Sequence, residues 1–403
     1  MSERTPAART DSGRELNRGA VFDVIRRRQP VSRAELGRIT GLQRRTIWRV
    51  TDELLREAWV VEVGHARSPD GRNPALLSLS DKRNAIAVAF EDSHLVFGAA
   101  DLAGNFFRQE VVRIGPDPGC VLEAIVSGIL RTVHLCHGRS IDGVGISLPV
   151  WRHQVASWGG RGEDVWQAAS DIRNRVASAT GLPVDLDTEA NACIAASVLF
   201  DGLDECQRLA VVHVAEEIQV GFLSNGQLVH GPGSDGLGHV SLDPSGPACA
   251  CGGRGCWTWL ASNSAAIRQY SGPEAVAGGV SFSDLLSLSE RGDACANAAL
   301  QRMALYLGRG IRIVAAAFAP ECILVTGKLA ACWSRFGPVI GAELAADVGA
   351  AARPPRLIPR HDPLLPLRGA VAMVFLREFP TNRWRRGLSG LNAAPGERNH
   401  GRH

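Results

Sequence analysis

The chain has 403 residues, of which 45% are hydrophobic and 21% are charged, and its formal net charge is +3 at pH 7. This length allows two or three domains with sizeable cores, and the composition is that of a globular protein. The first twenty residues are polar and rich in Arg, and we find no apolar run of about 18 residues, so neither a signal peptide nor a membrane span is predicted. We therefore expect a cytoplasmic protein with no membrane partner, in which the ten cysteines are reduced.

Charge is distributed unevenly along the chain. Residues 17–83 contain fourteen Arg or Lys and eight Asp or Glu, a net charge of +6, whereas residues 84–382 sum to about −7. A basic front on an acidic body predicts an N-terminal module that binds a polyanion. Residues 1–16 lack helical periodicity and are expected to form a flexible arm, and residues 383–403 are expected to be a disordered basic tail.

Residues 17–82 begin with the pattern of two short helices. The first has one apolar face and ends before Pro30, which cannot continue a helix. Ser32 with Glu35 three residues later is the capping-box signature of a second helix, and Gly41 ends that helix.

A third helix is predicted to begin near Gln43, because Ile47, Val50 and Leu54 recur at helical spacing and must face a core. Its opposite face consists of Gln43, Arg44, Arg45, Thr46, Trp48 and Arg49. Such a helix fits the major groove of DNA, where Arg contacts guanine or phosphate.

Two strand-like runs, residues 59–64 and 75–79, follow the third helix and flank the turn-rich segment 65–74. With the three helices they predict a winged helix-turn-helix over residues 17–82. The alternative is a small helical bundle with a solvated basic face.

From residue 84 onward, apolar runs of strand length alternate with helical segments, which predicts an α/β architecture. Strands are expected at 85–90, 95–100, 143–148, 184–186, 209–214 and 322–326, and helices at 118–137, 165–180, 191–200 and 294–318. Residues 369–379 are expected to close the domain.

The most informative stretch contains His239, Cys249, Cys251 and Cys256, with three glycines between the last two cysteines. One imidazole and three thiolates on a Gly-rich loop match the ligands and the tight turns that a tetrahedral structural Zn²⁺ needs. Four protein ligands leave no open position for water, so a catalytic zinc is not indicated. The alternative, a disulfide with spare thiols, requires an oxidising compartment.

This stretch resembles the zinc loop of the ROK family of sugar kinases and transcriptional repressors. The shared pattern is G-H-x4-P-x-G-x-x-C-x-C-G-x-x-G-C, at residues 238–256. The N-terminal region is similar to that of the family's repressor branch, with S-R-A-E-L at 32–36, T-G-L at 40–42 and G-R-x-P at 71–74. The resemblance extends from about residue 17 to about residue 376.

The resemblance implies a winged helix-turn-helix followed by a two-lobed ROK domain over residues 83–382, with a ribonuclease H-like, actin-like fold and a cleft between the lobes. It implies a homodimer, or a higher homo-oligomer, that binds a palindromic operator in double-stranded DNA. The residues expected to contact DNA are Ser32, Arg33, Gln43, Arg44, Arg45, Thr46, Arg49 and, in the minor groove, Arg72.

The positions that carry kinase chemistry in this family are altered here. The first phosphate loop, D-x-G-G-T in the kinases, is Glu91-Asp92-Ser93-His94, and the second, G-T-G-x-G, contains Glu216 and Glu217. Glu189 stands for the catalytic Asp, and Thr326-Gly327 for a later Gly-Gly pair. Carboxylates in place of glycine N–H groups repel phosphate, so we expect no kinase activity and no other enzymatic activity.

The positions that contact sugars in the family are also changed, because the expected Glu before the zinc loop is missing and Trp257-Thr258 replaces a Leu-Glu pair. A cleft for a sugar or another small effector is expected near Thr188, Glu189, Asn191, Asp235 and His239.

The sequence thus predicts a DNA-binding transcriptional regulator, expected to be a repressor. Two alternatives stay open: a ROK sugar kinase fused to a DNA-binding head, and a DNA-binding regulator that needs no ligand.

Overall fold

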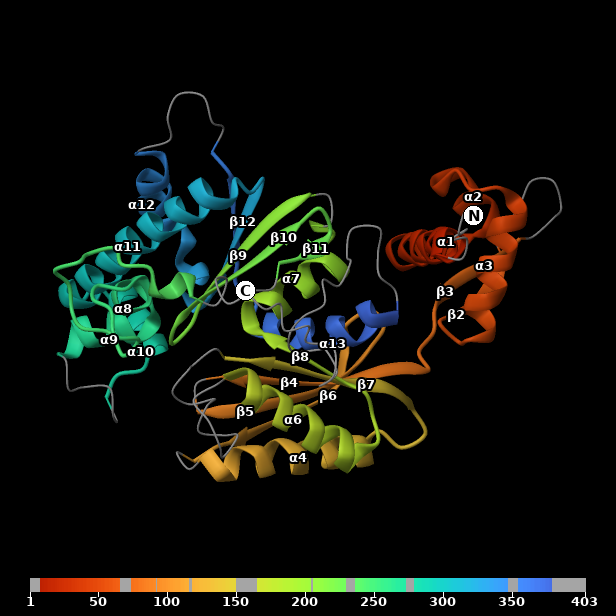
Figure 1. The fold of residues 1–403 in the computed structure, drawn as a ribbon, viewed down its shortest axis with the longest axis horizontal. Coiled ribbons are helices and arrows are strands. Elements are labelled where there is room, and N and C mark those ends of the chain that lie inside the picture. Colours follow the sequence, from red (N-terminus) through yellow and green to blue (C-terminus); the bar gives the residue numbers. More distant parts are fainter. Residues whose placement is uncertain are drawn as a thin grey trace, which may run out of the picture.

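The computed structural model describes residues 8–65, 74–91, 93–115, 118–149, 165–203, 206–229, 236–272, 279–346 and 354–378. It consists of an N-terminal head, residues 8–79, and two lobes that each contain a five-stranded sheet (Figure 1). This mixture of helices and sheets confirms the predicted α/β class.

Three helices make up most of the head: α1 (Ala8–Arg28), α2 (Arg33–Thr40) and α3 (Arg44–Arg56). Ser32 caps α2 and completes the predicted capping box, because its hydroxyl accepts from the Glu35 N–H and the Glu35 carboxylate accepts from the Ser32 N–H at 3.0 Å. Gly41 ends α2 in the left-handed conformation, with φ of +70°, which a residue with a side chain rarely adopts.

The N-terminal segment differs from the prediction. Helix α1 begins at Ala8, so residues 8–16 of the expected flexible arm are helical, and residues 1–7 lie outside the described part of the chain. Arg14 lies 2.8 Å from Glu53, and Arg18 forms an ion pair with Glu57, and both of these contacts hold α1 against α3. The two residues of such a pair are 39 positions apart in the sequence, so the local pattern of apolar residues could not predict these contacts.

The head also contains a small antiparallel sheet with strand order β1-β3-β2. The two longer strands, β2 (Val60–His65) and β3 (Ala75–Leu79), agree with the predicted strand pair, and β1 (Val31–Ser32) adds a short third strand. The predicted tip between β2 and β3, including Arg72, lies outside the described residues, as does the predicted tail at 383–403.

The sheets of the two lobes have the same topology. Their orders are β6-β5-β4-β7-β8 and β11-β10-β9-β12-β13, and in each the first three strands in chain order are antiparallel while the fourth and fifth are parallel to the first. This repetition agrees with the duplicated fold expected for residues 83–382. The strands are β4 (Arg83–Glu91), β5 (His94–Asp101), β6 (Phe106–Arg113), β7 (Ser140–Leu148), β8 (Val184–Thr188), β9 (Arg208–Val214), β10 (Ile218–Ser224), β11 (Gln227–Leu228), β12 (Cys322–Gly327) and β13 (Arg356–Arg360).

Helices cover both sheets (Figure 1). In the first lobe α4 and α6 pack on one face, and α7 and α13 pack on the other. In the second lobe α8 to α12 form a helical layer that shares a core with β9, β10 and β12. Their bounds are α4 (Pro118–Leu135), α6 (Val165–Thr180), α7 (Glu189–Leu199), α8 (Trp257–Ala261), α9 (Asn263–Ser271), α10 (Phe282–Glu290), α11 (Ala294–Phe318), α12 (Trp333–Ala345) and α13 (Leu365–Glu378), with short 3-10 turns at Leu237–His239 and Lys328–Cys332.

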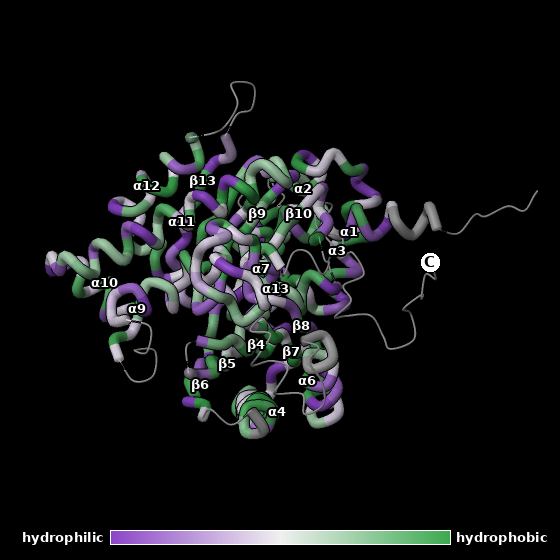
Figure 2. Tube along the Cα trace, turned by 60° about the vertical axis from the view of Figure 1, so that its left-hand side comes forward, coloured by the Kyte–Doolittle hydropathy of each residue, from purple (hydrophilic) through white to green (hydrophobic). Residues whose placement is uncertain are grey.

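Burial follows the hydropathy of these elements. Strands such as β4 and β9 carry long hydrophobic stretches inside the molecule (Figure 2), and most of their side chains are buried. None of the described helices combines the length and hydropathy that crossing a bilayer requires.

The head shares a hydrophobic core with the first lobe. Trp59 lies between Phe22 of α1, with ring centroids 5.9 Å apart, and Phe375 of α13, at 6.5 Å, and both contacts are edge-to-face. The Arg83 guanidinium lies 3.8 Å from the centre of the Trp59 ring. Trp59 therefore contacts both parts of the molecule.

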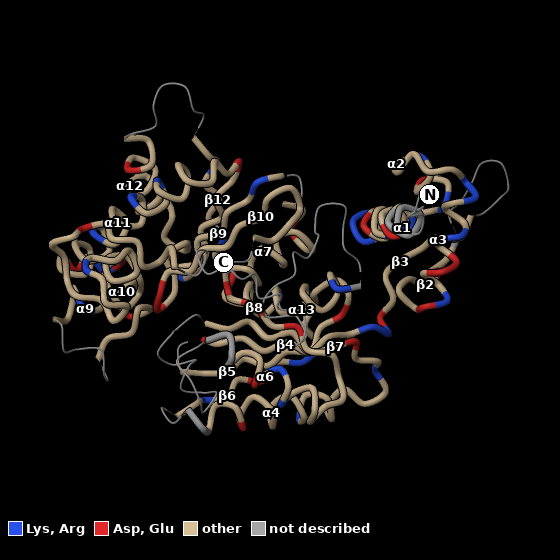
Figure 3. Tube along the Cα trace, in the orientation of Figure 1, with Lys and Arg blue, Asp and Glu red and all other residues tan. Residues whose placement is uncertain are grey.

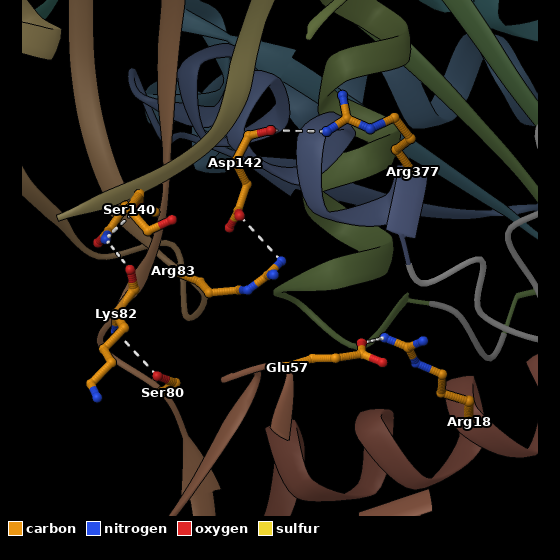
Figure 4. A network of polar contacts seen from close by, with 9 residues as sticks. Arg18, Glu57, Ser80, Lys82, Arg83, Ser140, Asp142 and Arg377 are labelled. Carbon is orange, nitrogen blue, oxygen red and sulfur yellow. Dashed lines mark hydrogen bonds and ion pairs between the residues drawn. The ribbon is translucent and has the colours of Figure 1, made fainter. Parts of the chain in front are cut away.

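Polar contacts continue this junction (Figure 4). Arg83 forms a 3.1 Å ion pair with Asp142 at the start of β7, and Arg377 of α13 donates to the backbone carbonyl of Asp142 at 3.0 Å. The Arg377 guanidinium also contacts the buried Asp185 at 2.6 Å. Helix α13 is thus fixed to both the head and the sheet of the first lobe.

We predict that Trp59→Ala lowers the free energy of unfolding by about 3–5 kcal/mol, because a large buried ring leaves a cavity. Urea unfolding followed by circular dichroism measures this change. The matched control is Trp48→Ala, whose ring is 49% exposed and for which we expect a loss of less than about 1 kcal/mol. Equal losses for the two variants would contradict a shared core at Trp59.

Candidate functional site

Helix α3 presents arginines to solvent. Arg44, Arg45 and Arg49 are exposed and form no ion pair with the described residues. Basic residues lie along α2 and α3 in Figure 3. Two of these arginines occupy the first turn of α3, where the helix dipole disfavours positive charge. They therefore cost helix stability and strengthen the attraction for an anion at that end.

The other residues of the head that were expected to contact DNA differ in exposure and in their partners. Gln43 is the exposed N-cap of α3, and Thr46 is half-buried. Ser32 is only 5% exposed and caps α2. Arg33 donates at 3.0 Å both to the Thr51 hydroxyl and to Glu62, so it already has partners inside the head.

One exposed residue of α3 was absent from the expected set of contacts. The Trp48 ring lies on the outer face of α3, 4.5 Å from the Arg33 guanidinium. Its position between Arg45 and Arg49 on the polar side of the helix already indicated that the ring is exposed.

The predicted metal ligands converge on one point. The donor atoms of His239, Cys249, Cys251 and Cys256 all lie within 4.8 Å of one another. The Cys251 and Cys256 sulfurs are 3.5 Å apart, and Cys249 Sγ is 3.5 Å from His239 Nδ1. A tetrahedral ion bound at about 2.3 Å needs donors about 3.5–3.8 Å apart, whereas a disulfide needs about 2.05 Å. This cluster can therefore hold a metal ion.

Glycines give the cluster its shape. Gly252 and Gly255 have φ of +90° and +54°, and a Cβ on Gly255 would lie 1.8 Å from the Asp243 carbonyl oxygen. The next residue after the cluster, Trp257, is fully buried in the second lobe, against Gly310 of α11. The cluster is thus anchored on a core helix, and Trp257 belongs to that core.

A pocket that is open to solvent lies where the two lobes meet. It is lined at the ends of β4, β9 and β12, at the start of α9, and at the segment that leads into α13. The lining residues are Phe90, Glu91, Glu189, His213, Val214, Ala215, Glu216, Asn263, Thr326, Gly327, Lys328, His361, Asp362, Pro363, Leu365 and Pro366.

This pocket brings together the altered kinase positions. Glu91 comes from the expected first phosphate loop, Glu216 from the second and Thr326-Gly327 from the last. Gly327 has φ of +112°, and a Cβ there would lie 2.0 Å from the Val214 carbonyl oxygen, so β9 and β12 approach closely at the pocket wall. The pocket occupies the place where the resemblance locates a nucleotide.

Buried titratable groups form the floor of the pocket. Gln219 Nε2 donates to Glu189 Oε2 at 2.7 Å, and His213 Nδ1 lies 2.7 Å from the Thr326 hydroxyl. Burial raises the pKa of the Glu189 carboxyl to about 8 and lowers the pKa of the His213 imidazole to about 4. Although Glu189 Oε2 and His213 Nε2 are 3.7 Å apart, both groups are therefore neutral near pH 7 and do not form an ion pair.

Among the described residues that were expected to form the effector cleft, Glu189 alone lines this pocket. The Thr188 hydroxyl caps α7 and accepts from the Asn191 N–H, and the Asn191 side chain donates to Asp187 at 2.8 Å. His239 belongs to the metal cluster, and Asp235 lies outside the described residues. Asn263, Lys328 and Asp362 line the pocket without having been expected, because they come from three distant segments with no local motif.

We predict that Glu189→Gln changes how stability depends on pH. The pKa of Glu189 is raised from 4.5 to about 8 in the folded state. The stabilisation by the protonated Glu189 carboxyl is therefore fully present below about pH 4.5 and is lost as the pH rises toward 8. Relative to wild type, the variant should gain about 3 kcal/mol of unfolding free energy between pH 5 and pH 8. Urea unfolding across this range is the measurement, with the exposed Glu123→Gln as control. A difference that is constant with pH would contradict a neutral, buried Glu189.

Comparison with known proteins agrees with this geometry. Residues 158–354 match the sequence model of the ROK family. The xylose repressor of Bacillus subtilis (strain 168) is 24% identical over 322 residues, which cover 78% of this chain and 83% of the repressor.

Two solved structures share the fold. A ROK family transcriptional regulator, described as a homolog of the E. coli MLC protein, aligns with a TM-score of 0.71 at 21% identity, over 92% of this chain and 98% of that chain. A ROK family glucokinase from Streptomyces griseus aligns with a TM-score of 0.58 at 20% identity, over 72% of this chain and 98% of the kinase. These similarities show that residues 158–354 of this chain are a ROK family domain and that most of the chain is similar to ROK proteins.

Proposed function

We propose that this protein is a transcriptional regulator of the ROK type, acting in the cytoplasm as a repressor that binds double-stranded DNA through its head. The observation that carries the proposal is the set of exposed arginines on α3 without acidic partners among the described residues. The repressor named above, which matches most of this chain, supports the same conclusion.

In this proposal the head is a winged helix-turn-helix, and α3 enters the major groove. Arg44, Arg45 and Arg49 then face base edges and phosphates, and Gln43 lies at the end of the helix that enters first. Arg72 belongs to the proposed wing and reaches the minor groove. Two copies of the chain bind two half-sites of a palindrome, because a symmetric dimer presents two identical heads.

Kinase activity is not part of the proposal. An enzyme that transfers phosphate surrounds the phosphates with N–H groups, cations and a metal ion. Here Glu91 and Glu216 line the corresponding pocket, where carboxylates take the place of groups that attract phosphate.

We propose that the metal cluster holds one structural Zn²⁺ through His239, Cys249, Cys251 and Cys256. Three thiolates and one imidazole favour zinc over harder cations such as Mg²⁺ or Ca²⁺. The ion would stabilise a loop that has little core of its own and fix it against α8.

We predict that Arg44→Ala/Arg45→Ala weakens binding to specific DNA at least about tenfold, since each lost base contact costs about 1–3 kcal/mol. DNA fragments selected from the source genome by the full-length protein provide the target, and fluorescence anisotropy at two salt concentrations gives the affinity. Arg175→Ala, an exposed arginine of α6 in the first lobe, is the control and should bind normally. Unchanged affinity of the double variant would remove α3 from the interface.

We predict about one equivalent of zinc in the purified protein and a strong loss of zinc in Cys251→Ser. Because metal binding contributes to folding free energy, removal of the ion by a chelator should lower the melting temperature of wild type. Elemental analysis and thermal unfolding test both points. Cys295→Ser, which alters an exposed cysteine outside the cluster, should keep its zinc. Equal zinc content in both variants would contradict the assigned ligands.

A further inference from the structure

Two cysteines outside the metal cluster lie in contact where the chain enters the second lobe. Cys206 precedes β9, Cys322 is the first residue of β12, and their sulfur atoms are 2.6 Å apart. Both thiols are free in this structure. We infer that Cys206 and Cys322 form a reversible redox pair, which hydrogen peroxide converts to a disulfide and small thiols convert back.

The separation of the two sulfurs distinguishes this pair from the thiols of the metal cluster. Cys251 and Cys256, which are placed to share an ion, have sulfurs 3.5 Å apart. A disulfide bond is about 2.05 Å long, so the sulfurs of Cys206 and Cys322 need to approach by only about 0.5 Å for the bond to form. A tetrahedral metal ion does not fit between sulfurs this close, because it needs sulfurs about 3.5–3.8 Å apart.

Backbone contacts hold the two cysteines next to each other. The N–H of Gln207 donates to the carboxylate of Glu321 at 3.1 Å, and these two residues directly follow Cys206 and precede Cys322 in the chain. Strands β9 and β12 are parallel neighbours, with Leu209 opposite Cys322 (Figure 1). The paired strands thus bring together two thiols that are 116 positions apart in the sequence.

The pair lies just below the protein surface. Cys206 is 8% exposed and Cys322 is 5% exposed. Their neighbours Gln207, Glu321 and Arg356 are exposed. Because thiol oxidation depends on access, this limited exposure favours an oxidant as small as hydrogen peroxide over a bulky disulfide such as oxidised glutathione.

Arg356 identifies Cys322 as the thiol that reacts first. Its guanidinium Nη2 lies 3.7 Å from the Cys322 sulfur, and a nearby cation stabilises the thiolate, which is the reactive form of cysteine. Burial, together with the neighbouring Cys322 sulfur, raises the pKa of the Cys206 thiol to about 12, so Cys206 is protonated at neutral pH. One sulfur therefore meets the oxidant and the other completes the disulfide.

The reaction balances with one molecule of hydrogen peroxide. The Cys322 thiolate attacks a peroxide oxygen, the O–O bond breaks, and Cys322 becomes a sulfenic acid while hydroxide leaves and takes up a proton. The negative charge of Cys322 that helps to raise the pKa of Cys206 is removed at this step. The Cys206 sulfur then attacks the Cys322 sulfur, the S–O bond breaks, and the leaving hydroxide takes the Cys206 proton as water.

The two thiols thus lose two electrons, which the peroxide gains as it becomes two molecules of water. Two molecules of a small thiol reverse the change by exchange and leave as their own disulfide.

The disulfide would enclose a long segment of the second lobe. Residues 206–322 contain the metal cluster and helices α8 to α11. A disulfide that closes a long loop restricts the unfolded chain and so stabilises the folded state. Cytosolic disulfides are mostly transient and respond to redox conditions. The pair therefore couples the stability of the second lobe to peroxide, and this inference does not depend on the proposed DNA binding.

The test is treatment of the folded, full-length protein with hydrogen peroxide, followed by blocking of free thiols, digestion and mass spectrometry. We expect a cross-linked peptide pair that contains Cys206 and Cys322 and that dithiothreitol separates. Cys206→Ser and Cys322→Ser should lack this link, and Cys295→Ser, which changes an exposed cysteine outside the pair, should form it normally. Folded wild type in which Cys206 and Cys322 stay unlinked would overturn the inference, whether or not its exposed cysteines are oxidised.

Two further readouts distinguish a redox pair from a chance contact. In Cys206→Ser the sulfenic acid of Cys322 meets no thiol, so dimedone should label Cys322, whereas in Cys322→Ser dimedone should leave Cys206 unlabelled. The change in melting temperature on oxidation should be more positive in wild type than in Cys206→Ser by at least about 5 °C. Labelling of Cys206 in place of Cys322, or the same change in melting temperature for both proteins, would contradict the assigned pair.

Discussion

The contact of Trp59 with Phe375 and Arg83 is the interaction on which the arrangement of the head and the first lobe depends. The indole belongs to the head, but most of its surface is covered by α1, α13 and the start of β4. The head therefore cannot swing on a free linker, because separation would expose a large aromatic ring. A change in the orientation of the head therefore requires a movement of α13 or of β4, the first strand of the first lobe.

The duplicated sheets bring the ends of β4, β9 and β12 to the same pocket. In an enzyme with this topology, glycine turns at those ends can hold phosphates. Here Glu91 and Glu216 line the pocket at those ends, so the corresponding positions of this scaffold carry carboxylates. The fold fixes where a ligand would lie, and the side chains decide its charge.

Much of the local structure could be predicted from the sequence alone. The capping box at Ser32, the left-handed Gly41, the long helix Ala294–Phe318 and the convergence of three cysteines with His239 depend on residues close together in the chain. Their geometry follows from backbone sterics and short loops, which local spacing encodes. The start of α1 at Ala8 was missed for the opposite reason, because its ion pairs to α3 are distant in sequence.

The sequence by itself determined the α/β class, the metal-ligand cluster and the arginine-rich face of α3. Only the tertiary structure decided that Asn263, Glu216 and Asp362 line one pocket, that Glu189 is neutral near pH 7, and that Arg33 is held inside the head. Burial, unsatisfied hydrogen bonds and shifted pKa values arise from neighbours that chain folding brings together, and residue types along the chain do not specify those neighbours.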